Sequence, residues 1–388
     1  MTTRRRVLQS IGAGVAGVLA GHRFAFATAD TDARLVVLLL RGGMDGLSAV
    51  PAFGDPDFEG ARAGLAMAPE SVLKLDDTFG LHPNLKGLAE LFRRRELAVV
   101  HAVATPYRER SHFDGQNLLE NGSEAPFGMQ SGWLNRAIAL LPSVNRPLGV
   151  ALDSNMPLVL RGAAPVSSWS PSLLPAPRAD TMQRLAALYA ETDPALAQSF
   201  ARAQGANALA RQGAAAGRAF GALMSAAARF LVAPEGTRIA VAEIGGWDTH
   251  VNQAGARGAL ANNLATLDRG IETLRTELGS VWTNTMLIAV SEFGRTVAQN
   301  GTGGTDHGVG GAMFLAGGAL RGGRVIADWP GLKPANLYKQ RDLAATTDFR
   351  SVALGVLRDH LRIDEARLAS VFPSDRAVRP LGGLARTA

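Results

Sequence analysis

Cysteine is absent from this chain of 388 residues. Its absence excludes disulfide bonds, thiolate zinc sites, iron–sulfur clusters and cysteine nucleophiles, so a bound metal must take Asp, Glu, His, Asn or Ser as its ligands. Lysine is scarce, at positions 74, 86, 333 and 339 alone, and arginine carries nearly all of the positive charge. Arginine in such excess suits bidentate recognition of phosphate or sulfate, although genome composition also produces it.

The net charge of +6 gives little support to a nucleic-acid partner. Four arginines, at positions 4, 5, 6 and 23, lie in an N-terminal segment that we expect to be removed. Without them 36 basic residues face 34 acidic ones, a net charge of +2. The basic run at 93–95 ends an amphipathic helix and is predicted to lie on its solvated face. We therefore expect no nucleic-acid partner.

Long hydrophobic runs are also missing. No stretch of about 18 apolar residues is present, so we expect no stable membrane span. Residues 3–9 read Thr-Arg-Arg-Arg-Val-Leu-Gln, which looks like a twin-arginine export signal, and small-residue cleavage sites follow. We predict a signal peptide over 1–29, with a short amphipathic helix as the alternative. Such a signal implies passage through the twin-arginine translocase and a periplasmic or secreted protein.

The rest of the chain predicts an α/β fold. With 47% apolar residues it can bury a large core. Residues 34–40 form a continuous apolar run, typical of a strand buried on both faces in a parallel sheet. Further strands are predicted over 96–103, 148–152, 238–244, 285–291 and 312–316, and helices over 82–95, 111 onward, 131–141, 254–278 and 348 onward. This alternation predicts a doubly wound, mostly parallel sheet flanked by helices, in one domain over 30–388.

Two segments interrupt this alternation. Residues 154–178 are rich in Pro and Ser and are predicted to be a long loop. Residues 180–232 are rich in Ala, Leu and Arg and predict a helical insertion or cap of two or three helices. Because the two segments lie outside the predicted sheet, we expect them to frame the mouth of a pocket.

Polar residues beside glycine follow most of the predicted strands. In open α/β sheets ligands bind at the carboxyl ends of the strands. Carboxylates and imidazoles together are ligands for zinc, manganese or a similar divalent ion. The predicted metal ligands are Asp45, Glu243, Asp248, His250, Glu292, Asp306 and His307. The alternatives are a turn cap for Asp45, a structural pair for Asp248 and His250, and a plain turn for Asp306-His307.

Five motifs together resemble the DUF1501 family, whose members are exported by the twin-arginine route and placed with the alkaline phosphatase/sulfatase superfamily. They are Leu-Arg-Gly-Gly-Met-Asp-Gly-Leu-Ser at 40–48, Arg-Ser-His-Phe-Asp at 110–114, Gly-Gly-Trp-Asp-Thr-His at 245–250, Ser-Glu-Phe-Gly-Arg-Thr at 291–296 and Thr-Asp-His-Gly at 305–308. The resemblance covers essentially the whole mature chain. It implies an alkaline-phosphatase-like fold and one or more divalent ions: zinc, manganese, magnesium or calcium.

The resemblance also implies roles for single positions. Asp45 matches the superfamily's metal-binding Asp after the first strand, and Asp306-His307 matches its later Asp-His pair. Glu243 and Asp248 follow the order found in alkaline phosphatases, but His250 comes two residues after Asp248, where those enzymes place a His four residues later. The last His ligand of the superfamily has no match, because His360 lies in the final helix and is predicted to be a surface or core residue.

The nucleophile of the superfamily sits at a helix N-terminus after an early strand, where the helix dipole favours an anion. Ser111 matches this place, with Arg110 beside it to bind a tetrahedral anion, and a plain N-cap serine is the alternative. Ser48 is a lesser candidate. His112 is a further catalytic candidate, as a ligand, an acid or base, or a residue of the helix start.

Three functions remain to be compared. A metal-dependent hydrolase of phosphoric or sulfuric esters accounts for the Asp, Glu and His set. A non-catalytic relative that binds a surface polymer or carbohydrate accounts for the missing last His and the uncertain nucleophile. A dinucleotide-binding oxidoreductase is disfavoured, because the glycines at 42–43 lack the Gly-x-Gly-x-x-Gly spacing. The substrate itself cannot be deduced from the sequence.

Overall fold

A mostly parallel sheet forms the centre of the structure, with strand β1 (Arg34–Leu40) near its middle. The computed structural model describes residues 32–142, 147–171, 177–211, 220–234, 236–253, 258–373 and 378–386. The signal peptide predicted over 1–29 lies outside these residues. In the described part of the chain, no helix combines the length and the apolar composition that crossing a membrane requires.

The main sheet runs in the order β10-β4-β9-β8-β1-β7-β5-β6, and β11 pairs with β4. Strands β1, β7 and β8 are parallel neighbours, whereas β9 runs antiparallel to both β4 and β8. The sheet is therefore mixed but mostly parallel. Its other strands are β4 (Leu97–Ala104), β5 (Gly149–Ala151), β6 (Val166–Ser168), β7 (Ile239–Ile244), β8 (Thr285–Ser291), β9 (Gly311–Ala316), β10 (Arg324–Ile326) and β11 (Thr347–Asp348).

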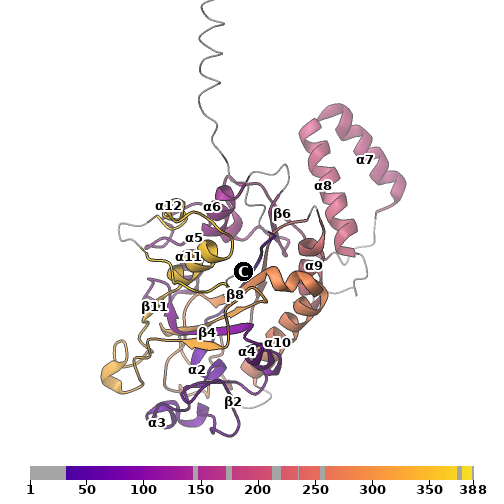
Figure 1. Cartoon of the computed structure of the whole chain (residues 1–388). Coiled ribbons are helices and arrows are strands. Elements are labelled where there is room, and N and C mark those ends of the chain that lie inside the picture. The colour runs from indigo at the N-terminus through magenta and orange to yellow at the C-terminus, as the bar shows by residue number, and fades with distance from the viewer. Residues whose placement is uncertain are drawn as a thin grey trace, which may run out of the picture. The chain divides into compact units, whose positions relative to one another are not determined.

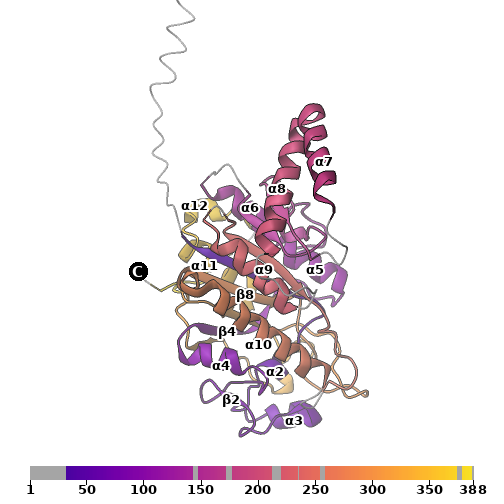
Figure 2. The ribbon, with the colours of Figure 1, turned by 90° about the vertical axis from the view of Figure 1, so that its right-hand side faces the viewer.

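Helices cover both faces of this sheet (Figures 1 and 2). One face packs against α4 (Lys86–Arg93), α9 (Phe220–Val232) and α10 (Ala259–Leu278). The other packs against α5 (His112–Asn121), α6 (Trp133–Leu140), α11 (Phe349–Asp359) and α12 (Glu365–Leu368). The side chains of β1 alternate between the two cores, which explains why all seven of its residues are buried. The predicted doubly wound α/β architecture is confirmed.

The predicted helical segment over 180–232 contains three helices. The first two are α7 (Ala179–Thr192) and α8 (Pro194–Arg211), and the third is α9. Helix α9 contributes to the core beside α10, whereas α7 has no buried residue. Helix α9 therefore belongs to the layer of helices on the sheet, whereas α7 and α8 are additions to it.

Several small elements were not predicted from the sequence. They are α2 (Gly46–Ala49), α3 (Phe58–Arg62), the hairpin of β2 (Leu73–Lys74) and β3 (Gly80–Leu81), and the short 3-10 helices at 63–65, 158–160, 279–284 and 334–336. Strand β6 also lies inside the segment predicted to be a loop. Helices α2 and α3 matter for the site, because they carry buried polar residues beneath it.

Candidate metal centre

Three loops meet at the carboxyl ends of β1, β7 and β8. Two glycines permit this contact: a Cβ on Gly42 would lie 2.6 Å from the backbone nitrogen of Asp248, and one on Gly304 would lie 2.3 Å from the carbonyl carbon of His250. Real side chains do not tolerate such distances, so these positions require glycine. The close approach brings the segments around 42, 248–250 and 304–307 together.

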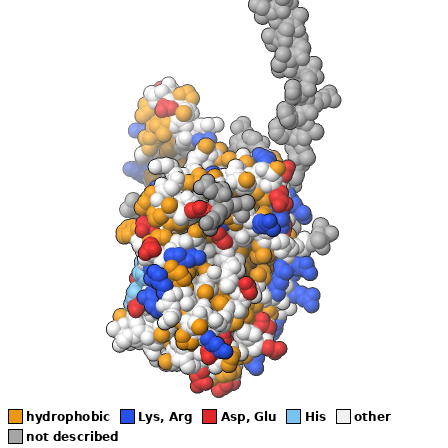
Figure 3. All heavy atoms as spheres, turned by 90° about the vertical axis from the view of Figure 1, so that its left-hand side faces the viewer, with side chains coloured by type: hydrophobic (Ala, Val, Ile, Leu, Met, Phe, Trp, Pro, Cys, Tyr) orange, Lys and Arg blue, Asp and Glu red, His pale blue; other side chains and the backbone are white. Residues whose placement is uncertain are grey.

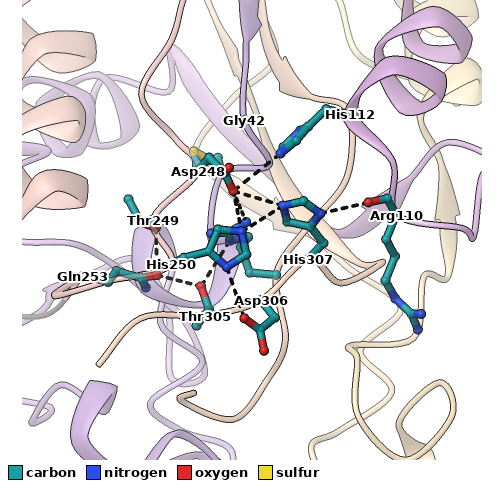
Figure 4. A network of polar contacts seen from close by, with 12 residues as sticks. Gly42, Arg110, His112, Asp248, Thr249, His250, Gln253, Thr305, Asp306 and His307 are labelled. Carbon is teal, nitrogen blue, oxygen red and sulfur yellow. Dashed lines mark hydrogen bonds and ion pairs between the residues drawn. The ribbon is translucent and has the colours of Figure 1, made fainter. Parts of the chain in front are cut away.

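Three imidazoles point at one carboxylate oxygen, as Figure 4 shows. The Oδ1 atom of Asp248 lies 2.9 Å from the Nε2 atom of His250, 3.0 Å from that of His307 and 3.5 Å from that of His112. The Nε2 atoms of His250 and His307 are themselves 3.0 Å apart. His112 begins α5, Asp248 and His250 follow β7, and His307 precedes β9. We call these four residues the His3Asp cluster.

The opposite ring nitrogen of each imidazole has a hydrogen-bond acceptor. His112 Nδ1 lies 2.7 Å from the Glu292 carboxylate, and His250 Nδ1 lies 3.1 Å from that of Asp306. His307 Nδ1 lies 2.9 Å from the carbonyl oxygen of Arg110. Ionised carboxylates and carbonyls only accept hydrogen bonds, so each Nδ1 carries the proton, and in the neutral ring each Nε2 carries a lone pair.

The lone pairs therefore converge on a point where a cation fits. Lone pairs facing a carboxylate oxygen at about 3 Å repel it unless a proton or a metal ion lies between. The buried Nε2 atom of His112 has no hydrogen-bond partner among the residues that the structure describes. Donor atoms of His112, Asp248 and His307 all lie within 4.8 Å of one another. Ligands about 2.0–2.1 Å from a tetrahedral zinc ion are themselves roughly 3.3 Å apart, close to the spacing seen here.

Two carboxylates contact the imidazoles of the cluster on the side that faces away from Asp248. Glu292 is buried and accepts from His112, from the backbone of Gly42 and from Gln116. Asp306 is half-exposed and accepts from His250 and from Asn300. Carboxylates in such positions fix the orientation of metal-binding imidazoles and raise their basicity.

The electrostatics of the cluster keep its carboxylate ionised. Burial tends to raise the pKa of Asp248, but the nearby positive charge outweighs it, chiefly through the hydrogen bond from the Arg295 guanidinium, and that pKa falls to about 2. The hydrogen bond to Glu292 raises the pKa of His112, whereas burial lowers the pKa of His307. The hydrogen bond from Asn300 is the largest effect that lowers the pKa of Asp306.

Asp45 and Glu243 are placed outside the cluster. The Asp45 carboxylate is buried and receives the Arg62 guanidinium, the Ser48 hydroxyl, the Gln253 amide and two backbone N–H groups of α2. These five donors lie outside the His3Asp cluster, so the structure does not bring Asp45 into that cluster, and its role as a metal ligand stays a prediction. Glu243 forms a two-bond ion pair with Arg41.

The two other catalytic candidates also have structural contacts. Ser111 is the N-cap of α5, and its hydroxyl oxygen accepts a long bond from the backbone of Asp114. Arg110 directs its guanidinium to the buried Asp342, away from the cluster, and contacts His307 only through its carbonyl oxygen. Their catalytic roles stay predictions, whereas the geometry groups His112 with the other residues of the His3Asp cluster.

Sequence reasoning missed three residues around the cluster. Arg295 is buried and donates to Asp248 at 2.7 Å, and within the described part of the chain one of its terminal nitrogens has no hydrogen-bond partner. Gln253 is a buried amide between two of the loops. Arg341 is half-exposed and donates to the carbonyl of His307. Arg295 lies within a motif that was recognised, but no local pattern marks the other two.

The fold and the site together define the class of this protein. It is a layered α/β protein with imidazoles and a carboxylate gathered at the carboxyl ends of its strands. The chain belongs to the DUF1501 family: the family model described as "Protein of unknown function (DUF1501)" matches residues 32–372. A search of curated proteins finds no significant match.

Solved structures align with the chain at low scores. The C-terminal periplasmic domain of EcEptC from Escherichia coli, in complex with Zn, aligns over 73% of this chain and 72% of that chain, with 10% identity and a TM-score of 0.37. The phosphonate monoester hydrolase of Agrobacterium radiobacter aligns over 75% of this chain and 70% of that chain, with 13% identity and a TM-score of 0.29. Murine ectonucleotide pyrophosphatase/phosphodiesterase 5 aligns over 68% of this chain and 57% of that chain, with 10% identity and a TM-score of 0.29. TM-scores this low carry no argument about function.

Proposed function

We propose that this protein is an exported metal-dependent hydrolase of phosphoric or sulfuric esters, with one divalent ion held by the His3Asp cluster. One observation carries the proposal: three Nε2 atoms converge on Asp248 Oδ1 while every Nδ1 is bound to an acceptor. In this arrangement the three lone pairs face one point, where a metal ion would satisfy them. An ion held there would supply Lewis-acid chemistry to an ester oxygen.

The ligand chemistry favours some metals over others. Three imidazole nitrogens and one carboxylate oxygen suit zinc or another transition ion. Calcium and magnesium prefer oxygen ligands, so the cluster disfavours both. Among the ions that the sequence left open, we therefore propose zinc first and manganese second.

A cation for the ester's negative charge lies at the edge of the cluster. The Arg341 guanidinium is held on one side by Asp342 at 2.8 Å and on the other by the carbonyl oxygen of His307, yet its side chain is 44% exposed. A fixed and accessible guanidinium suits phosphate or sulfate oxygens. Figure 3 shows Lys and Arg side chains beside His side chains at one edge of the surface that it draws.

The roles of the chain's own groups follow from these contacts. Glu292, Asp306 and the Arg110 carbonyl hold the three imidazole rings in the ligating tautomer. Arg295 orients Asp248, and Arg341 binds the anionic part of the ester. Ser111 remains the candidate nucleophile, although its hydroxyl oxygen takes part in capping α5.

The test combines metal content with turnover. Wild-type protein and His307→Ala are purified from the native export route, their zinc and manganese are measured by mass spectrometry, and p-nitrophenyl phosphate, bis-p-nitrophenyl phosphate and p-nitrophenyl sulfate are assayed. We expect about one ion per wild-type chain, ester hydrolysis by the wild type, and loss of both in the variant. A wild type without any bound metal and without turnover overturns the proposal.

A binding protein without catalysis is the second candidate, and one contact favours it. The Asp45–Arg62 ion pair, 2.5 Å long and fully buried, places a guanidinium on a carboxylate that would otherwise be available to a second ion. A centre restricted to one ion is compatible with a structural or ligand-binding role. Stoichiometric metal with no turnover on any ester of the panel would favour this candidate, with a surface polymer or carbohydrate as the ligand.

A further inference from the structure

A single buried amide joins two of the loops that carry the His3Asp cluster. Gln253 is 2% exposed. Its Oε1 atom accepts hydrogen bonds from the hydroxyl of Thr249 at 2.8 Å and from the hydroxyl of Thr305 at 2.6 Å. Figure 4 shows the amide between the two threonines. Both threonines are buried as well, so these bonds are formed away from water.

The two threonines occupy informative places in the chain. Thr249 lies between Asp248 and His250, and Thr305 lies two residues before His307. The backbone nitrogen of Thr305 also donates to the carbonyl of Thr249 at 3.2 Å. The Gln253 oxygen therefore fixes the distance between a loop with two cluster residues and a loop with a third.

The orientation of this amide is determined by its other end. The Nε2 atom of Gln253 lies 2.5 Å from Asp45 Oδ2 and 3.1 Å from the hydroxyl oxygen of Ser48. A carboxylate accepts only, so the nitrogen must face Asp45 and the oxygen must face the threonines. A flipped amide would set its oxygen against the carboxylate.

Asp45, which accepts from the amide nitrogen of Gln253, is itself held by several contacts. Asp45 is paired with Arg62, whose side chain is completely buried and also donates to the backbone carbonyl of Val297 at 2.8 Å. Asp45 caps α2 through two backbone N–H groups. Buried polar groups held by several hydrogen bonds resist displacement, because each broken bond leaves an unsatisfied group.

A second connection leads from the threonines to the cluster. The hydroxyl oxygen of Thr305 accepts from Arg295 Nε at 3.2 Å, and Arg295 Nη1 donates to Asp248 Oδ1 at 2.7 Å. The side chain that orients Asp248 is thus positioned by a hydroxyl that Gln253 holds. Both connections begin at the same amide.

We propose that Gln253, anchored by the Asp45–Arg62 pair, is the positioning residue of the metal centre. It sets the separation between the 248–250 and 305–307 loops and so brings Asp248, His250 and His307 to ligating distance. The inference rests on the proposed metal centre, since it assigns what holds that centre in shape.

Cobalt(II) is the probe for this role, because it binds zinc-type sites and its visible absorption reports coordination geometry. We compare wild type, Gln253→Met and Thr305→Val, each stripped of metal. Three quantities are measured: the thermal stability of the stripped protein, the cobalt dissociation constant and the visible spectrum of the cobalt form. We expect both variants to bind cobalt 10- to 100-fold more weakly, the range found for groups behind metal ligands, with a changed spectrum.

A matched control separates positioning from general loss of stability. Asn135 is another buried amide, which bonds to the carbonyls of Leu160 and Ala164 near α6. Asn135→Leu should lower the stability of the stripped protein but leave cobalt affinity and spectrum unchanged. If Gln253→Met does not fold, Thr305→Val carries the comparison, since it removes one hydroxyl and keeps the shape.

The outcomes distinguish this inference from the proposed function. If the wild type binds no cobalt, the metal centre and its positioning residue are both overturned. If the wild type binds cobalt and the two variants bind it with the same affinity and spectrum, the metal centre stands and the role of Gln253 is overturned. Weaker binding with a changed spectrum in the variants, but not in Asn135→Leu, supports the role.

Discussion

The Glu292 carboxylate lies 2.7 Å from His112 Nδ1 and is 1% exposed, whereas the Asp306 carboxylate, 3.1 Å from His250 Nδ1, is 53% exposed. The two pairs have the same chemistry in different surroundings. A hydrogen bond in a buried site is stronger than one beside water, because less solvent screens it. The contribution of each carboxylate to metal binding should therefore differ.

Exchanging each carboxylate for its amide tests this difference. We expect Glu292→Gln to weaken zinc binding by about 10- to 100-fold, and Asp306→Asn to weaken it less, because water substitutes for the lost oxygen charge. Competition with a chromogenic chelator gives both dissociation constants. Equal losses in the two variants would contradict the argument from burial.

Removing an imidazole should cost more than removing the group behind it. His112→Ala takes away a donor atom that lies 3.5 Å from Asp248 Oδ1, so we expect zinc affinity to fall beyond about 100-fold, the upper range for outer partners. The next residue, Phe113, is 86% exposed and supplies the control. Phe113→Ala should retain full metal content by mass spectrometry, and retention of metal by His112→Ala would remove that residue from the cluster.

The buried Asp45–Arg62 pair should contribute strongly to stability. Asp45→Asn leaves the Arg62 charge without its partner, which costs about 3–5 kcal/mol in the free energy of unfolding at pH 7. Burial tends to raise the pKa of Asp45, but Arg62, Ser48 and Gln253 together hold it below its ordinary value. A lowered carboxyl pKa stabilises the fold above the ordinary pKa, and this contribution is lost as the pH falls. Urea titrations should therefore show that the difference in the free energy of unfolding between wild type and Asp45→Asn becomes smaller toward low pH.

His101 should make the fold sensitive to acid in a different range. It lies on β4 and is completely buried, and this burial lowers its pKa to about 4. A histidine whose folded pKa lies below its unfolded value of 6.5 destabilises the fold as the pH falls through that window. The loss is about 2 kcal/mol at pH 5. His101→Gln should abolish this part of the pH dependence of unfolding between pH 7 and 4, and an unchanged dependence would assign it to other groups.

Arg341 should affect the substrate and not the metal. Its half-exposed guanidinium is placed at the edge of the cluster by Asp342 and the His307 carbonyl. For any ester that the wild type hydrolyses, we expect Arg341→Met to raise KM several-fold and to leave zinc content unchanged. A variant that loses metal instead would show that the guanidinium supports the position of His307.

The strands were predictable because their signal is local. Residues 35–40 and 286–290 are apolar throughout, and burial on both faces of the sheet requires that composition. The direction of β9 was not predictable, since an apolar run over 311–316 reads the same whether the strand is parallel or antiparallel. Strand β6 was hidden for the opposite reason, because its three residues Val166–Ser168 are too few and too polar to stand out.

The site was also predictable only in part. Asp248, His250 and His307 follow strands, and that position alone predicts that they meet. Asp45 follows a strand as well, but its partner Arg62 lies on a short helix, and nothing in the sequence near either residue indicates the pair. Gln253 is similar, because its position between the loops depends on Asp45 and Thr305, which are remote from it in the chain. Pairings of this kind depend on tertiary structure alone.

The spread of the cluster along the chain has a consequence for the order of events during biogenesis. Its members come from positions 112, 248, 250 and 307, and strands β1, β4, β7 and β8 must all be in register before they can meet. Closing loops of this length is a late and slow step in folding. A nascent chain or a proteolytic fragment that ends before residue 307 lacks the last imidazole. Metal should therefore enter only after nearly the whole polypeptide has collapsed, which makes tight zinc retention a practical reporter of complete folding.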